Sequence, residues 1–354
     1  MADGADTQQR AYIGSFTSAG GRGVTTAALD GETGALTPLH HTGDAVPDPS
    51  FLALSQDGAF LYAVSETEQG GAGAFALGGR GPRPHGPTVP VDGSAPTHLA
   101  LAAGRLHTAN YGSGNVSSLR VSPDGALEGP ALTHQHQGGG PVPERQEGPH
   151  AHAVVPDPSG RWLLCVDLGT DSVWVYDLHG DGPAPRPHRE VPLRAGSGPR
   201  HLAFPPGGGA PERAYVVNEL DSTVTTCRWD PRDGALEPLG ETGTLPQERA
   251  RAVNHPSALA LSPDGRFAWA ANRGDDTLAV LALETGGGVP ELLATVDCGG
   301  HWPRDLAVHP SGRWLYAANE RSGDVTWFTV DKAAGMPHRA GSLAIPAASC
   351  VVFG

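Results

Sequence analysis

The chain of 354 residues carries a net charge of −14, and its 24 basic residues include a single lysine, Lys332. Nucleic acids and anionic membranes are bound through basic faces, so this charge balance argues against both classes of partner. Glycine (50 residues) and proline (33 residues) are abundant, which is typical of a fold with many turns.

The N-terminal segment MADGADTQQR has no signal-peptide pattern, and no apolar run approaches membrane-spanning length. We therefore expect a cytoplasmic protein, with a disordered tail over residues 1–9 and a single domain over residues 10–354. We expect a monomer or a weak homodimer. The cysteines lie in or beside apolar runs without CxxC or Cys/His spacing, which favours buried, reduced thiols: Cys165, Cys227, Cys298 and Cys350.

In chain order, the first predicted strands are residues 11–16 and 23–29. Longer units of one pattern follow at 48–77, 95–121, 148–178, 198–229, 255–283 and 302–330. In the clearest unit, apolar runs at 258–261, 267–271 and 277–283 are separated by the turn residues SPDG and NRGD, and residues 292–296 add a fourth run. Such a unit is an antiparallel meander of four strands.

The meanders recur about every fifty residues, which is the period of propeller blades. The N-terminal unit lacks its first strand, and residues 349–353 supply one at the other end of the chain. Pairing these two segments would close the ring and remove its open edges. The sequence therefore predicts an all-β fold, a seven-bladed β-propeller closed by its C-terminal strand.

Three segments between the units are irregular. Residues 78–90 and 180–188 are rich in Pro and Gly and are expected to connect strands at the outer edge. Residues 133–148 form the longest loop, which is interpreted either as a rim or lid or as a variable surface excursion. We expect His134 and His136 in this loop to be solvated rather than to bind a metal, and we expect no metal or cofactor.

In each blade the start of the first strand and the end of the second lie at the same end of the sheet, around the channel mouth. Four first strands have a small hydroxyl residue at this position: Ser50, Thr97, Ser257 and Ser349. The other three first strands have His152, Arg200 and Arg304 there. The repeated Asn at the second-strand ends is explained by turn formation. One residue further on stand Ser15, Glu66, Tyr111, Leu168, Glu219, Arg273 and Glu320.

Five ionisable residues thus converge on one mouth, which favours a functional site there: His152, Arg200, Glu219, Arg273 and Arg304. These regions also resemble a known family. The segments GPHAH (148–152), GPRHLAF (198–204), VVNEL (216–220), AANRG (270–274) and WPRDLAVHPSGRWLYAANE (302–320) are similar to the seven-bladed lactonases. That family includes bacterial 6-phosphogluconolactonases and fungal carboxymuconate cyclases.

The resemblance implies that His152, Arg200, Glu219 and Arg273 are catalytic, with His150 as the second choice for the histidine. Arg304 comes from the strand register and not from the resemblance. We expect Arg304 to bind substrate together with His150, His201, Asn218 and Asn272.

In lactone hydrolysis a His would activate water and Arg side chains would stabilise the oxyanion, without a metal. An Arg-rich mouth suits a small anionic sugar lactone as the ligand. Two alternatives stay open: a carboxymuconate-type cycloisomerase, and a non-catalytic ligand-binding or scaffold propeller.

Overall fold

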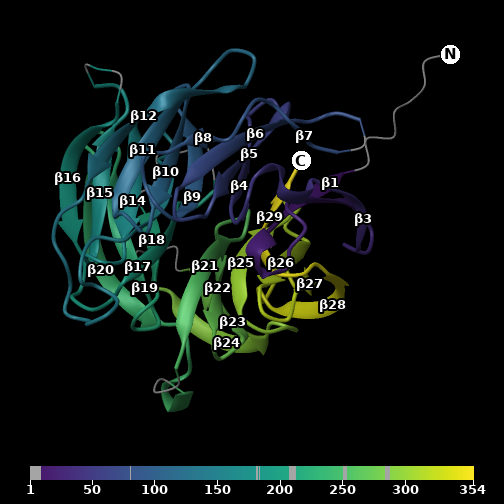
Figure 1. Cartoon of the computed structure of the whole chain (residues 1–354). Coiled ribbons are helices and arrows are strands. Elements are labelled where there is room, and N and C mark those ends of the chain that lie inside the picture. Colours follow the sequence, from purple (N-terminus) through teal and green to yellow (C-terminus); the bar gives the residue numbers. More distant parts are fainter. Residues whose placement is uncertain are drawn as a thin grey trace.

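The computed structural model describes residues 9–79, 81–180, 182, 184–206, 213–249, 253–283 and 288–354. These residues form seven antiparallel sheets arranged in a ring (Figure 1), which confirms the predicted seven-bladed propeller. The predicted tail of residues 1–9 lies, apart from Gln9, outside the described residues. Within the described residues there is no helix long and apolar enough to cross a membrane.

The strands of each blade follow one another from the central channel outward. Blade 1 consists of β29 (Ala348–Phe353), β1 (Arg10–Ser15), β2 (Thr25–Leu29) and β3 (Leu36–His41). Blade 2 has β4 (Leu52–Leu54), β5 (Phe60–Ser65), β6 (Gly71–Ala76) and an outer strand split into β7 (Arg83–Pro84) and β8 (Val89–Pro90). Blade 3 has β9 (Pro96–Ala102), β10 (Arg105–Asn110), β11 (Asn115–Val121) and β12 (Leu127–Gln135).

Blade 4 consists of β13 (Ala151–Pro156), β14 (Trp162–Asp167), β15 (Ser172–Asp177) and β16 (Arg186–Pro192). Blade 5 has β17 (Pro199–Ala203), β18 (Arg213–Asn218), β19 (Thr223–Asp230) and β20 (Ala235–Gly243). Blade 6 has β21 (His255–Leu261), β22 (Phe267–Arg273), β23 (Thr277–Ala282) and β24 (Glu291–Asp297). Blade 7 has β25 (Pro303–Val308), β26 (Trp314–Asn319), β27 (Asp324–Val330) and β28 (Pro337–Ala344). Single 3₁₀ turns lie at Thr17–Ala19, Gly43–Ala45 and Gln247–Arg249.

The hydrophobic core is divided among the seven spaces between neighbouring blades. Each cluster of buried apolar residues in the described chain joins two adjacent sheets, as where Trp162 of blade 4 packs in one cluster with Trp229 of blade 5. Each sheet therefore buries apolar side chains on both faces, and removing one blade would expose two clusters. This arrangement explains why so long a chain need not divide into two separate cores. The four cysteines are buried and unpaired, as predicted.

A repeated hydrogen bond also ties neighbouring blades together. An aromatic side chain on the second strand of one blade donates to a backbone carbonyl of the next blade. The pairs are Tyr62 Oη to Gly125 O (2.9 Å), Trp162 Nε1 to Pro231 O (2.8 Å), Trp269 Nε1 to Gly335 O (2.8 Å) and Tyr316 Oη to Gly34 O (2.7 Å). The polar atom of each of these four aromatic side chains is thus satisfied while its ring fills the core.

The ring closes as the sequence predicts. Strand β29 pairs antiparallel with β1, with Ala11 opposite Phe353 and Ile13 opposite Val351, and Figure 1 shows the C-terminus beside β1. β29 also contacts β25 of blade 7 and β4 of blade 2, so it is the inner strand that links both ends of the chain.

Deleting residues 347–354 is expected to yield aggregated protein, because it removes the inner strand of blade 1 and exposes the edge of β1. Size-exclusion chromatography and a thermal melt would test this, and a peptide of residues 347–354 added during refolding should restore soluble protein. A soluble, cooperatively melting truncation would show that β29 is not needed for closure.

A β-bulge recurs where the inner strands reach the channel mouth. In six blades the register between the first and second strands shifts there, at Thr97, His152, Arg200, Ser257–Ala258, Arg304 and Ser349. A bulge bends the strand locally and re-aims a side chain. The bulge therefore presents an inner-strand side chain at the mouth in each of these blades.

Several strand boundaries differ from the prediction by a few residues, and two of these differences bear on the site. β22 continues through Arg273, which pairs with His255, so the strand ends one residue beyond the Asn predicted to end it. β12 runs to Gln135 because Asn115–Ser117 on β11 pair with its end, which shortens the predicted loop of residues 133–148.

Candidate active site

One pocket at the channel mouth gathers most of the predicted site. It has a volume of about 180 Å³ and is lined by Glu66, Thr97, Tyr111, Arg145, His152, Arg200, Glu219, Arg273 and Arg304. The structure thus brings together the four predicted catalytic residues, His152, Arg200, Glu219 and Arg273, with Arg304 beside them. Their roles in catalysis stay predictions.

Two places in the blade supply these side chains. His152, Arg200 and Arg304 stand at the inner-strand bulges. Arg273 is the last residue of β22, and Glu219 directly follows β18, where its backbone N–H donates to Gly198 O at 2.7 Å. Because strands one and two are antiparallel, both positions lie at the same end of the sheet.

Glu219 is the centre of the arginine cluster. Its Oε2 accepts a hydrogen bond from Arg273 Nη2 at 2.6 Å and lies 3.1 Å from Arg200 Nε, while its Oε1 accepts from Arg145 Nη2. The two deeper arginines are also fixed by backbone carbonyls. Arg273 Nε donates to His255 O at 2.9 Å, and Arg200 Nη1 donates to Ser257 O. The cluster is therefore held in one arrangement before any ligand binds.

The cluster carries excess positive charge, since three guanidinium groups surround one carboxylate. Burial would raise the pKa of Glu219, but Arg273, Arg200 and Arg145 hold that pKa well below its ordinary value. Burial and then Arg273 lower the pKa of Arg200, because one carboxylate does not balance both arginines. Buried charge that lacks a partner is costly, so an anionic ligand is favoured here.

His152 lies against this cluster and is neutral near neutral pH. Only 5% of the residue is exposed, and its Nδ1 is buried without a hydrogen-bond partner among the described residues. Burial, followed by Arg200, Arg304 and Arg273, lowers the pKa of His152 well below its ordinary value. A neutral imidazole keeps a lone pair that can accept a proton.

Arg304 differs from the other arginines because carboxylates balance its charge. Its Nη2 lies 3.0 Å from both oxygens of Glu66, and its Nη1 donates to Glu320 Oε2 at 3.1 Å. Burial opposes the charge of Arg304, but Glu66 and Glu320 raise its pKa overall. Its guanidinium carbon also lies 4.7 Å from the ring centre of Phe16. A substrate-binding role for Arg304 stays a prediction, and its partners show that it also ties blade 7 to blade 2.

The other predicted binding residues do not line the pocket. His150 stacks on Tyr111, and its ring Nδ1 lies 2.8 Å from Tyr111 O. His201 lies beside His152, with ring centres 5.6 Å apart. Asn218 and Asn272 bind their own turns, through Thr223 Oγ1 and Thr277 Oγ1. Substrate binding by these four residues therefore stays a prediction, and any effect of their side chains on the substrate would be indirect, through the residues that line the pocket.

The sequence pattern does not predict Arg145 as a site residue, although its side chain lines the pocket and binds Glu219. It belongs to the irregular loop of residues 133–148, which has no counterpart in the other blades, so the repeat register assigns it no position. Glu66 and Tyr111 stand one residue beyond second-strand ends, where that register places them at the mouth without giving them a role.

The expectation that His136 is solvated is wrong. His136 is buried: its Nδ1 lies 2.6 Å from Asp167 Oδ2, its Nε2 lies 2.6 Å from Tyr176 Oη, and its ring stacks on Trp174. These partners all come from blade 4. They bury the residue where the Gly-rich composition of the following loop suggested exposure. His134 is partly exposed and contacts Tyr176 at 3.2 Å.

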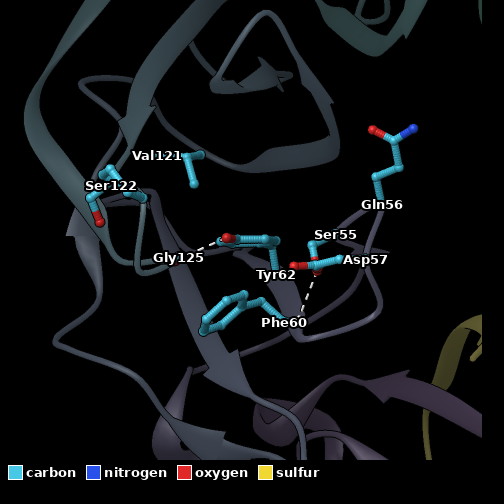
Figure 2. Close-up of a pocket in the computed structure, with 9 residues that line it drawn as sticks. Ser55, Gln56, Asp57, Phe60, Tyr62, Val121, Ser122 and Gly125 are labelled. Atoms are coloured by element: carbon cyan, nitrogen blue, oxygen red, sulfur yellow. Dashed lines mark hydrogen bonds between the residues drawn. The ribbon is translucent and has the colours of Figure 1, made fainter.

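A larger pocket of about 420 Å³ lies away from this mouth, between blades 2 and 3 (Figure 2). Ser55, Gln56 and Asp57 on its wall belong to the turn after a first strand, which lies at the opposite end of the blade from the mouth. Four of its lining residues bind one another in pairs: Tyr62 Oη donates to Gly125 O, and Ser55 Oγ donates to Asp57 Oδ1 at 2.6 Å (Figure 2 shows the first of these). A notch whose one carboxylate, Asp57, is already hydrogen-bonded to Ser55 is a weaker candidate for a catalytic site than the smaller pocket.

Acid should destabilise the protein before its carboxylates titrate, because burial lowers the pKa of several histidines. The pKa is lowered to about 3 for His98 and about 4 for His107, and well below its ordinary value for His152 and His201. The contribution of these groups to stability is full above about pH 6.5, the ordinary histidine pKa. It is lost as the pH falls toward the folded-state values, because the unfolded chain binds protons that the folded chain excludes.

The free energy of unfolding should fall by about 1.4 kcal/mol per pH unit for each such histidine. Denaturant unfolding between about pH 7 and pH 4 would measure this slope. His107→Gln keeps a donor for Ala102 O, which lies 3.3 Å from the ring Nε2. Because this variant removes one titrating histidine, the slope should fall by about 1.4 kcal/mol per pH unit. A slope unchanged in this variant would contradict the assignment.

Comparison with known proteins gives the same fold. Residues 10–353 match the sequence family described as Lactonase, 7-bladed beta-propeller. A 6-phosphogluconolactonase of Bacillus subtilis (strain 168) is 32% identical over 305 residues, which cover 84% of each chain. A periplasmic gluconolactonase of Pseudomonas aeruginosa has a TM-score of 0.90 and 28% identity, covering 98% of this chain and 99% of that one. A Bacteroides fragilis protein described as a candidate 6-phosphogluconolactonase has a TM-score of 0.90 and 28% identity over the full length of both chains.

Proposed function

Because this chain belongs to the seven-bladed β-propeller lactonase family, a family of lactone hydrolases, we propose that it opens an anionic sugar lactone. In this reaction water adds to the lactone carbonyl, the ring C–O bond breaks, and a hydroxy acid is released. The relatives include both a 6-phosphogluconolactonase and a gluconolactonase. Of the two lactones that these names imply, the arginine-rich pocket supports the phosphorylated one.

His152 is the proposed general base. Its neutral imidazole accepts a proton from the attacking water and returns one to the departing ring oxygen. Burial and then the neighbouring guanidinium groups lower its pKa, and an anionic substrate would offset the charge of those groups, so the imidazole becomes a stronger base once substrate binds.

Arg200 and Arg273 are proposed to stabilise the oxyanion that forms at the carbonyl. Both are buried and fixed by Glu219 and by backbone carbonyls, so their donors need no rearrangement when negative charge develops. Glu219 would keep the two arginines in place and limit their mutual repulsion.

The observation that carries this proposal is the placement of three arginines around one carboxylate, beside a buried neutral histidine. The carboxymuconate-type cycloisomerase remains the alternative, because the same arginines would hold the carboxylates of a muconate. A binding or scaffold propeller would not need a histidine at this place.

The proposal is tested by incubating purified protein with 6-phosphoglucono-δ-lactone, glucono-δ-lactone and a carboxymuconate. We expect acid release from the lactones above the spontaneous rate, fastest with the phosphorylated lactone. Turnover of the muconate alone would favour cycloisomerisation, and binding without turnover would favour a non-catalytic binding protein.

Activity is expected to survive removal of divalent ions. Among the described residues no group of three or more His, Cys, Asp or Glu side chains is arranged to hold a metal ion, which supports this prediction without testing it. The measurement is the lactonase rate after dialysis against a chelator. Loss of activity that one divalent ion restores would overturn the prediction. The cytoplasmic location, the monomeric or weakly dimeric state and the lack of nucleic-acid or membrane partners also remain predictions.

A further inference from the structure

We propose that Arg145 recognises the anionic group of the substrate and thereby sets the preference for a phosphorylated over a neutral sugar lactone. This inference rests on the proposed function, because it assigns a specificity to the same pocket. It concerns a residue of the loop over residues 136–148, which enters the pocket from outside the propeller repeat.

The three arginines around Glu219 lie at different depths. The side chain of Arg145 is 33% exposed, whereas those of Arg273 and Arg200 are 8% and 2% exposed. The reacting carbonyl must meet the buried donors, which are shielded from bulk solvent. The group at the far end of a sugar lactone then faces the outer part of the pocket, where Arg145 stands.

The contacts of Arg145 leave it able to bind an anion. The two buried arginines both face Oε2 of Glu219, and Arg145 reaches the other oxygen, Oε1, through Nη2. Burial disfavours the charge of Arg145, but Glu219 and the Tyr111 hydroxyl raise its pKa overall, so it stays protonated. A guanidinium has five N–H donors in a planar fork, which suits two oxygens of a phosphate.

The loop that carries Arg145 is anchored at both sides. Gln146 is buried, and its Nε2 donates to Leu168 O at 2.8 Å while its Oε1 accepts from Val142 N at 3.0 Å. At the start of the loop, His136 Nδ1 lies 2.6 Å from the buried Asp167. The loop is therefore held against blade 4, and Arg145 is presented in a fixed place.

This anchoring separates Arg145 from an ordinary surface arginine. A preorganised side chain loses less conformational entropy when it binds a ligand. Arg145 is the one residue of this loop in the pocket lining, and it contacts Glu219 Oε1 rather than the Oε2 that Arg200 and Arg273 face, so it can set the preference for the far end of the substrate while the donors at the carbonyl keep their own contacts.

The test is the equilibrium binding of 6-phosphogluconate and gluconate, measured by calorimetry on the full-length protein. Both products carry the carboxylate made from the lactone carbonyl, and only the first carries a phosphate. Arg145→Ala is expected to raise the Kd for 6-phosphogluconate by about 10- to 100-fold and the Kd for gluconate by less than about 3-fold. Arg145→Lys should fall between wild type and Arg145→Ala, because it keeps the charge without the fork.

Arg194→Ala is the matched control. Arg194 also pairs with acidic side chains, Asp221 and Glu241, but it lies outside the pocket, so the ratio of the two affinities should stay at the wild-type value. Equal weakening of both ligands by Arg145→Ala would show a merely structural role and overturn the proposal. A wild-type protein that binds 6-phosphogluconate no better than gluconate would overturn it as well.

The result can be separated from the proposed function because binding is measured without turnover. If the wild type hydrolyses no lactone but its preference for 6-phosphogluconate still depends on Arg145, the lactonase proposal fails and the specificity stands. If lactones are hydrolysed and the preference does not depend on Arg145, only the specificity fails.

Discussion

Substituting His152 by alanine is expected to lower kcat for lactone hydrolysis by about 10²- to 10⁴-fold, which is the usual contribution of a general base. The fold should survive, because the bulge at this position is held through the backbone carbonyl of His152, which accepts a hydrogen bond from the Thr97 side chain (Oγ1) at 2.8 Å and is kept in the variant. The measurement is steady-state kcat, with a thermal melt of each variant to confirm folding.

His150→Gln is the control for this substitution. His150 lies two residues away and is not itself a lining residue, although its ring stacks on the lining residue Tyr111, so kcat should change by less than about 10-fold. The wild-type kcat/KM should also lack an acidic limb near about pH 6.5, because the pKa of His152 is lowered below that ordinary value. Large loss in His150→Gln with activity kept in His152→Ala would assign the base to His150.

Replacing Arg200 by lysine is expected to lower kcat by about 10²-fold or more, the typical effect of losing one oxyanion donor. The fully buried guanidinium reaches Ser257 O and faces Glu219 at the same time, and a single ammonium group cannot reproduce that planar geometry. The measurement is kcat and KM with the phosphorylated lactone.

Arg194→Lys provides the control, because it makes the same chemical change at an exposed pair outside the pocket and should leave both constants unchanged. A raised KM with unchanged kcat in Arg200→Lys would show that Arg200 only holds the substrate. Its role at the oxyanion would then have to pass to Arg273.

The fold could be predicted from the sequence because each blade needs the same turns at the same spacing. The SPDG turn of residues 262–265 and the HPSG turn of residues 309–312 mark equivalent corners of neighbouring blades. The unpaired strand at each end of the chain then requires closure. The bulges have no signature of their own, yet counting back from these turns finds His152 and Arg200, because the bulge recurs at one place in each blade.

The rest of the site depends on contacts between distant segments. Arg145 reaches Glu219 across 74 positions of the chain, from a loop that no repeat aligns. His136 is buried because Asp167, Tyr176 and Trp174 of the next blade surround it, and nothing in its own segment indicates this. The local sequence pattern predicts where a strand ends, but it does not predict which distant loop packs against that strand end.

His152, Arg200, Glu219 and Arg273 are proposed to act as one catalytic unit, and the coupling between two of them can be measured. The measurement is kcat/KM of the wild type, His152→Ala, Arg200→Ala and the double variant with 6-phosphoglucono-δ-lactone. Residues that act as a unit are not additive, so the double variant should lose less than the product of the single losses. Glu320→Ala removes a carboxylate that binds Arg304, and it should lower kcat/KM less than Glu219→Ala does. Near-full turnover in His152→Ala, together with equal losses in Glu320→Ala and Glu219→Ala, would contradict the catalytic unit and place the site elsewhere on the ring.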